Sequence, residues 1–179
     1  MIRRICMALL VSLGCVAGAQ AEETTAARMF DRLRGLAGEW EGTFTWTDGR
    51  TGSGPLKATY YLTGFGSALI EDLLMDGKPY MTSIYHLDGP DLRVTHYCAA
   101  GNQPRFKAKK IDESAGTIEF TFVDVTNVTP KRPAHVEAIG LELVSADQVK
   151  VVFTFGGGPG MSGVEHIALK RTRPAPANG

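Results

Sequence analysis

Along most of the chain, hydrophobic and polar residues alternate with a period of two, which is typical of β-strands that bury one face. An earlier segment, residues 24–36, differs: its apolar residues recur at spacings of three and four, which predicts a short amphipathic helix. Gly35 and Gly38 mark the end of this helix. About ten strands are then predicted, at residues 40–46, 56–63, 68–75, 80–87, 92–98, 105–111, 117–123, 135–144, 148–155 and 164–171.

Short turn sequences such as MDGKP, DGPD and SADQ join the strands and favour antiparallel hairpins. A meander of this length closes most readily into a barrel, because closure removes both exposed edges. We therefore predict an all-β fold: an antiparallel up-and-down β-barrel of about ten strands with a short N-terminal helix. Residues 124–134 break the rhythm with two prolines, and we expect them to form a loop or lid over one end of the barrel.

The first 21 residues have the pattern of a secretion signal. Two arginines precede an apolar run over residues 5–17, and Ala-Gln-Ala at 19–21 fits the cleavage pattern. The run is shorter than the about 20 residues that span a bilayer. The alternative is a lipid anchor at Cys15. We expect an exported protein, periplasmic or secreted, without stable membrane insertion, divided into a signal peptide (1–21), a barrel (22–173) and a disordered tail (174–179).

Composition narrows the partner classes. Cleavage of the signal would leave Cys98 as the single cysteine, so an intramolecular disulfide is not expected. The chain has 44% hydrophobic and 21% charged residues, the balance of an ordinary globular domain. Its formal net charge is zero and it has no basic stripe, so we expect no nucleic-acid partner. The oligomeric state stays open.

Hairpin pairing predicts which side chains face the barrel interior. If Gly-Pro forms the tip of the hairpin at 87–92, Tyr85 shares a face with His96 and Cys98. This face is the more apolar one, so we expect these three side chains inside the barrel and His86 outside.

The same argument places further polar residues inside. If the loop GGGPGMSG joins Phe155 directly to Val164, the last strand turns His166 inward. The SAD turn then places His135 and Glu137, on the strand at 135–144, on the same side. Apolar pockets with a few convergent polar groups are typical of ligand sites. The expected cluster consists of Tyr85, His96, Cys98, His135, Glu137 and His166.

The turn AAGNQPRF, residues 99–106, allows two interpretations. At the mouth of the barrel, Asn102, Gln103 and Arg105 could contact the polar head group of a ligand, since arginine donors form a fork that suits carboxylates. Equally, the turn could be a loop whose polar groups satisfy one another.

The motif Gly38-x-Trp40-x-Gly42 resembles the opening of calycin barrels: lipocalins, fatty-acid-binding proteins and nitrobindins. The resemblance implies structural roles, in which Trp40 closes one barrel end and Gly42 permits close strand approach. The stretch YHLDGPDLRVTHYCAAGNQPRF is similar to a family of uncharacterised exported bacterial proteins, which implies no assigned activity. Nitrobindins bind haem through a histidine on the final strand, which here is His166; Phe44 stands where they usually carry a third glycine.

We therefore expect a protein that holds an apolar or amphipathic small molecule in its barrel, without a cofactor or metal and with no catalytic residue assigned. One alternative is a nitrobindin-like haem protein with His166 as axial ligand, acting on nitrogen oxides. Another is an enzyme that uses His96 with Cys98 or Glu137, although residues two apart on a strand lie about 7 Å apart. A three-histidine zinc site of His96, His135 and His166 lacks any supporting spacing.

Overall fold

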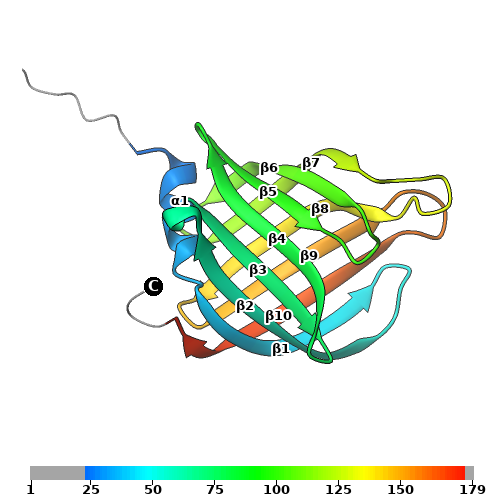
Figure 1. Ribbon diagram of the computed structural model, residues 1–179, viewed down its shortest axis with the longest axis horizontal. Coiled ribbons are helices and arrows are strands. Elements are labelled where there is room, and N and C mark those ends of the chain that lie inside the picture. Colours follow the sequence, from blue (N-terminus) through cyan, green and yellow to red (C-terminus); the bar gives the residue numbers. More distant parts are fainter. Residues whose placement is uncertain (1–22, 176–179) are drawn as a thin grey trace, which may run out of the picture.

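The computed structural model describes residues 23–175, which form one helix and ten strands (Figure 1). The predicted signal peptide and the last four residues of the predicted tail lie outside this range. None of the described helices is both long and apolar enough to cross a membrane.

The ten strands follow one another around a closed antiparallel barrel, in which each strand pairs with its neighbours in sequence and the first pairs with the last. This topology confirms the predicted all-β, up-and-down barrel with a short N-terminal helix. The elements are α1 (Thr25–Arg34), β1 (Gly38–Thr47), β2 (Ser53–Thr63), a 3-10 turn η1 (Gly64–Gly66), β3 (Ala68–Met75), β4 (Lys78–Asp88), β5 (Asp91–Tyr97), β6 (Gln103–Asp112), β7 (Thr117–Thr126), β8 (His135–Ser145), β9 (Gln148–Gly156) and β10 (Gly163–Pro174).

Helix α1 lies across one end of the barrel (Figure 1). The Thr24 hydroxyl caps it by accepting from the Ala27 N–H at 3.1 Å, and its apolar stripe, which includes Met29 and Leu33, is fully buried against the strands. Because the strands are antiparallel, the loops 48–52, 76–77, 98–102, 127–134 and 157–162 gather at the opposite end (Figure 1). We call this the open end because α1 does not cover it.

Trp40 and Arg171 hold the helix end of the barrel together. The buried Trp40 indole donates to the Leu36 carbonyl at 2.8 Å, and the Arg171 guanidinium lies 4.3 Å from the centre of that ring. Arg171 also donates to the carbonyls of Gly35 and Ala37 at 2.8 and 2.7 Å. These contacts tie the last turn of α1 to β10 and to β1.

The seam between β1 and β10 requires a glycine. A Cβ at Gly42 would lie 1.8 Å from the Ala168 carbonyl oxygen, so any side chain there would push the two strands apart. The structural interpretation of the Gly38-x-Trp40-x-Gly42 motif therefore has a physical basis in strand closure and in packing at the barrel end.

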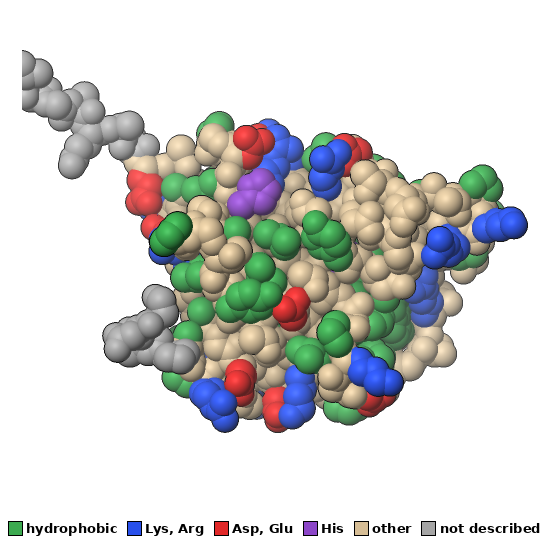
Figure 2. Space-filling view, viewed as in Figure 1, with side chains coloured by type: hydrophobic (Ala, Val, Ile, Leu, Met, Phe, Trp, Pro, Cys, Tyr) green, Lys and Arg blue, Asp and Glu red, His purple; other side chains and the backbone are tan. Residues whose placement is uncertain are grey.

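The outer surface is mixed. In the face over β2–β4, charged side chains of both signs lie mainly near the edges, and hydrophobic side chains occupy much of the middle (Figure 2). Tyr61 and Leu62, at the end of β2, are among the exposed large hydrophobic residues, and Phe65 on η1 projects fully into solvent.

Candidate functional site

The β4–β5 hairpin has the predicted register. Asp88 pairs with Asp91 across the turn, and the inward positions therefore include Tyr85, His96 and Cys98. Tyr85 and His96 are completely buried, and Cys98 is 8% exposed. The predicted inward placement of these three side chains is confirmed.

The predicted register of the last two strands is wrong by one residue. Phe155 pairs with Gly163 and not with Val164. As a result Glu165 points into the barrel, where it is fully buried, and His166 lies on the exposed outer face with its Nε2 atom 3.1 Å from the Thr47 hydroxyl. The first residue of β10 is a glycine, which adds nothing to the hydrophobic pattern. The strand therefore begins one residue earlier than the alternation in the sequence indicates.

The inward placement of His135 and Glu137 is also wrong. The β8–β9 pairing shifts between Val136 and Ala138, and this bulge turns Val136 inward. The Glu137 side chain is 50% exposed, and the partly buried His135 ring lies 2.8 Å from the Pro133 carbonyl and against Phe122. His96, His135 and His166 consequently do not converge on a metal site.

The three polar residues of the 99–106 turn have different surroundings. Asn102 is fully buried and donates from Nδ2 to the Ala134 carbonyl at 2.7 Å. Gln103 accepts from the Thr126 hydroxyl at 2.9 Å. Arg105, expected at the mouth, lies on the exposed outside of β6 and forms two 2.6 Å hydrogen bonds to Asp124.

A buried polar network in the barrel was not predicted. The Glu71 carboxylate accepts from Tyr60 at 2.5 Å and from Tyr85 at 3.1 Å, while the Ser83 hydroxyl lies 3.0 Å from His96 Nδ1. Alternation along ALIEDLLM places Glu71 between two inward leucines, which is a signal that the sequence does contain.

Burial controls the ionisation of this network. It raises the pKa of Glu71, and the hydroxyls of Tyr60, Ser83 and Tyr85 offset part of that rise. Burial also lowers the pKa of His96 to about 3, so the imidazole is neutral at physiological pH. Because Nδ1 is engaged by Ser83, only Nε2 of His96 is available to another group.

A second group of residues surrounds the open end, and we call it the open-end cluster: Trp46, Arg50, Tyr80, Cys98, Phe155 and Glu165. The guanidinium of Arg50 lies over the rings of Trp46 and Phe155, 4.6 and 4.7 Å from their centres, and donates to the Met161 carbonyl at 2.9 Å. The two rings pack with centroids 5.1 Å apart.

Ionisation in the open-end cluster follows burial as well. Burial raises the pKa of Glu165 to about 7, and the positive charge of Arg50 offsets part of the shift. Burial raises the pKa of Tyr80 to about 12 and also raises the pKa of the Cys98 thiol, in both cases with a contribution from the Glu165 charge. Tyr80 and Cys98 are therefore neutral at pH 7.

Several buried polar atoms at this end have no hydrogen-bond partner within residues 23–175. They are both carboxylate oxygens of Glu165, Oδ1 of Asn102 and Nε2 of His96. Phe153 connects two of these groups, since its ring lies 4.7 Å from that of His96 and it pairs with Glu165 across β9 and β10. A buried polar group left unpaired is costly, so such groups commonly mark a place for a ligand, water or ion.

The arrangement does not favour a thiol enzyme. Cys98 remains a protonated thiol that accepts only a long contact from the Ala100 N–H at 3.4 Å, and His96 directs Nδ1 to Ser83. The proposed partner Glu137 lies outside the barrel. A haem held inside the barrel by His166 does not fit either, because that side chain points outward.

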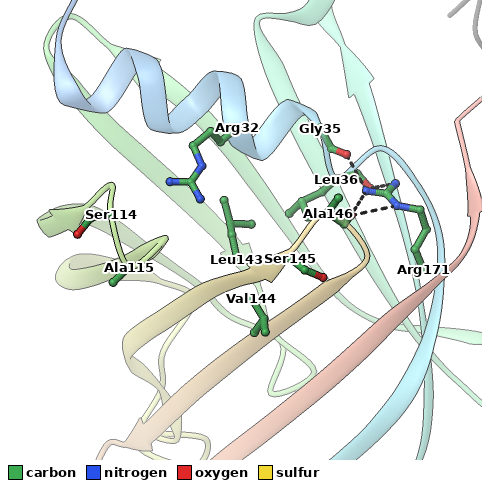
Figure 3. Close-up of a pocket in the computed structure, with 10 residues that line it drawn as sticks. All are labelled: Arg32, Gly35, Leu36, Ser114, Ala115, Leu143, Val144, Ser145, Ala146 and Arg171. Atoms are coloured by element: carbon green, nitrogen blue, oxygen red, sulfur yellow. Dashed lines mark hydrogen bonds between the residues drawn. The ribbon is translucent and has the colours of Figure 1, made fainter.

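A hollow of about 460 Å³ lies at the opposite, helix-covered end of the molecule (Figure 3). It is lined by residues from the end of α1, the β6–β7 turn and the β8–β9 turn, with Arg171 at one side. The Arg171 guanidinium is directed to backbone carbonyls and not into the hollow (Figure 3). The buried unpaired groups are all elsewhere, so this hollow is a weaker candidate site than the open end.

Solved structures share the fold. Rv2717c from M. tuberculosis is 16% identical and superposes with a TM-score of 0.55, covering 82% of this chain and 99% of that one. A DUF3598-family protein of unknown function from Nostoc punctiforme is 14% identical with a TM-score of 0.50, over 77% of this chain and 48% of that one, so the similarity spans about half of its length. No family model matches the chain, and no curated protein matches it.

Proposed function

We propose that this chain is an exported, calycin-type barrel protein that binds a small apolar or amphipathic molecule at its open end. The observation that carries the proposal is Glu165: a fully buried carboxylate, without a hydrogen-bond partner in the described chain, beside the aromatic rings of Trp46 and Phe155. A ligand whose polar group reaches Glu165 would remove the cost of leaving that carboxylate unpaired.

The fold supports this proposal. Closed barrels present their interiors only at the two ends, and in this protein α1 covers one of them (Figure 1). The other end combines apolar rings with a few polar groups, which is the usual composition of a ligand site. The polar groups that we assign to the ligand are Glu165, His96 and Asn102. Arg105 is no longer among them, because it pairs with Asp124 on the outer face of the barrel.

The cellular location is part of the proposal. The apolar run and cleavage pattern of the first 21 residues support export, and a cleaved protein would begin near Glu22. The comparison of full-length and exported forms by mass spectrometry after expression in a bacterial host tests this directly. Recovery of an uncleaved chain in the cytoplasm would contradict it.

Binding is tested with a neutral apolar fluorophore, N-phenyl-1-naphthylamine, titrated into protein purified from Glu22 onward. We expect saturable one-to-one binding that weakens at least tenfold in Trp46→Ala. His166→Ala is the matched control, since this side chain lies outside the barrel and should leave affinity unchanged. The absence of saturable binding, or equal binding by the Trp46→Ala protein, would overturn the proposal.

A further inference from the structure

The unpaired groups at the open end indicate which hydrogen-bonding groups a ligand must carry. Carboxylate oxygens can only accept hydrogen bonds when ionised, and Oδ1 of Asn102 is an acceptor because its Nδ2 already donates to Ala134. A ligand that satisfies these atoms must bring donors. Above pH 7, where Glu165 is ionised, a second acceptor such as a ligand carboxylate would add repulsion to a buried negative charge.

The neighbouring rings suit a positive charge. Trp46 pairs with Glu165 across β1 and β10, and its ring packs against Phe155. Aromatic faces attract cations through their quadrupole, and Arg50 demonstrates this here by lying over both rings. The aromatic faces and the buried carboxylate therefore both favour a positively charged ligand.

Arg50 occupies the aromatic faces without pairing with the carboxylate. Its stem packs on Gly163, where an added Cβ would come within 2.7 Å of its Cγ and Cδ atoms, and its guanidinium donates to the Met161 carbonyl. The residue belongs to the β1–β2 loop, outside any strand, so its side chain can leave the rings without disturbing the barrel ladder.

We infer that the open end is a binding site for an organic cation, a primary ammonium or a guanidinium on an apolar body, which replaces Arg50 on the rings and pairs with Glu165. This inference rests on the proposed function and specifies its ligand class. The ligand's apolar body would contact Trp46 and Phe155, and its N–H donors would reach the carboxylate.

The charge on Glu165 makes the binding dependent on pH. The groups that face this carboxylate are Arg50, Tyr80 and Cys98, and the last two are neutral up to pH 8. Below pH 7 Glu165 holds a proton, which a bound cation must displace. Affinity for a cation should therefore rise about tenfold per pH unit up to pH 7 and level off above it.

The experiment compares three ligands with the same body: hexylamine, hexanol and hexanoate, each titrated calorimetrically into the protein purified from Glu22 onward. At pH 8.5 hexylamine carries an ammonium. We expect it to bind at least tenfold more tightly than the other two, and we expect Glu165→Gln to abolish this preference. Arg50→Ala should tighten hexylamine binding severalfold, because the competing guanidinium is gone.

Two control variants test whether the effects on hexylamine binding are specific to the open end. Arg105→Ala removes an arginine from the outer face and His166→Ala removes an exposed histidine from the same face, so both variants should bind hexylamine as wild type does. Retained hexanol binding and an unchanged circular dichroism spectrum show that Glu165→Gln is folded, and Arg50→Ala tests the inference independently.

The outcomes distinguish the inference from the proposed function. Equal binding of the three ligands, or preference for hexanoate, would overturn the cation inference and leave the binding function intact. Failure of all three, together with failure of the neutral fluorophore, would overturn both. A loss of hexylamine binding in Arg50→Ala would also overturn the inference, since it would make Arg50 a ligand contact and not a competitor.

Discussion

At the residue scale, burial acts on His96 and Glu165 in opposite senses. It removes charge from both, so the histidine loses affinity for protons and the carboxylic acid gains it. Near pH 6 both side chains are neutral, and neither contributes a charge to the interior. As the pH rises above 7, Glu165 loses its proton and becomes the negatively charged one of these two side chains.

The first prediction concerns His96 and acid. Its pKa is about 3 in the folded protein against 6.5 for a free side chain, so below pH 6.5 the unfolded chain takes up a proton that the folded one does not. Stability attributable to His96 is full above pH 6.5 and falls by about 3 kcal/mol by pH 4. We expect His96→Gln to lose less stability than wild type between pH 7 and pH 4 in urea unfolding. Parallel profiles would contradict the assigned shift.

The second prediction concerns Glu165 and has the opposite sign. A raised carboxyl pKa means that the folded protein holds a proton that the unfolded chain releases, so stability falls as the pH rises from 4.5 to 7. The cost reaches about 3 kcal/mol above pH 7. Relative to wild type, Glu165→Gln should therefore gain stability as the pH rises from 4.5 to 8. The test is this pH-dependent difference in unfolding free energy, because any constant offset reflects the buried amide.

At the element scale, the sequence predicted the strands well and their faces only in part. The β4–β5 register was predictable because the two-residue turn fixes Asp88 opposite Asp91. The β9–β10 register was not, since the connecting loop is rich in glycine and could end at more than one position. The resulting error exchanged His166 for Glu165 and hid the central residue of the candidate site.

Bulges are the other source of error. The extra residue between Val136 and Ala138 leaves no mark in the hydrophobic pattern, yet it reverses the faces of His135 and Glu137. Arg50 was missed for a different reason: it lies in a loop, where strand alternation carries no information on direction.

The third prediction tests the seam between β1 and β10. Gly42→Ala places a methyl group 1.8 Å from the Ala168 carbonyl oxygen, so the strands must separate locally, and overpacking of this kind costs about 1–3 kcal/mol. Gly140→Ala is the matched control, because its added Cβ would meet nothing closer than 3.8 Å. Urea unfolding should show a clear loss for the first variant and little change for the second. An equal loss of unfolding free energy in both variants would contradict the claim that β1 and β10 need a glycine at position 42.

At the scale of the whole molecule, the barrel has two ends with different roles. Helix α1 closes one end with apolar side chains, and Arg171 fixes it to the last strand. The open end contains the buried, unpaired carboxylate and the aromatic faces. This division suggests that stability and ligand binding can be changed separately.

The fourth prediction uses that division. Leu33 on α1 is fully buried at the closed end, and Leu33→Ala should lower the unfolding free energy by about 2–5 kcal/mol. Arg34→Ala is the control, because its side chain is 42% exposed and pairs only at the surface with Asp31. In the folded Leu33→Ala protein, affinity for N-phenyl-1-naphthylamine should stay within twofold of wild type, since α1 and the loops of the open end lie at opposite ends of the barrel (Figure 1). A parallel loss of stability and affinity would instead place the bound molecule deep in the barrel, against the helix, and would move the site away from Glu165.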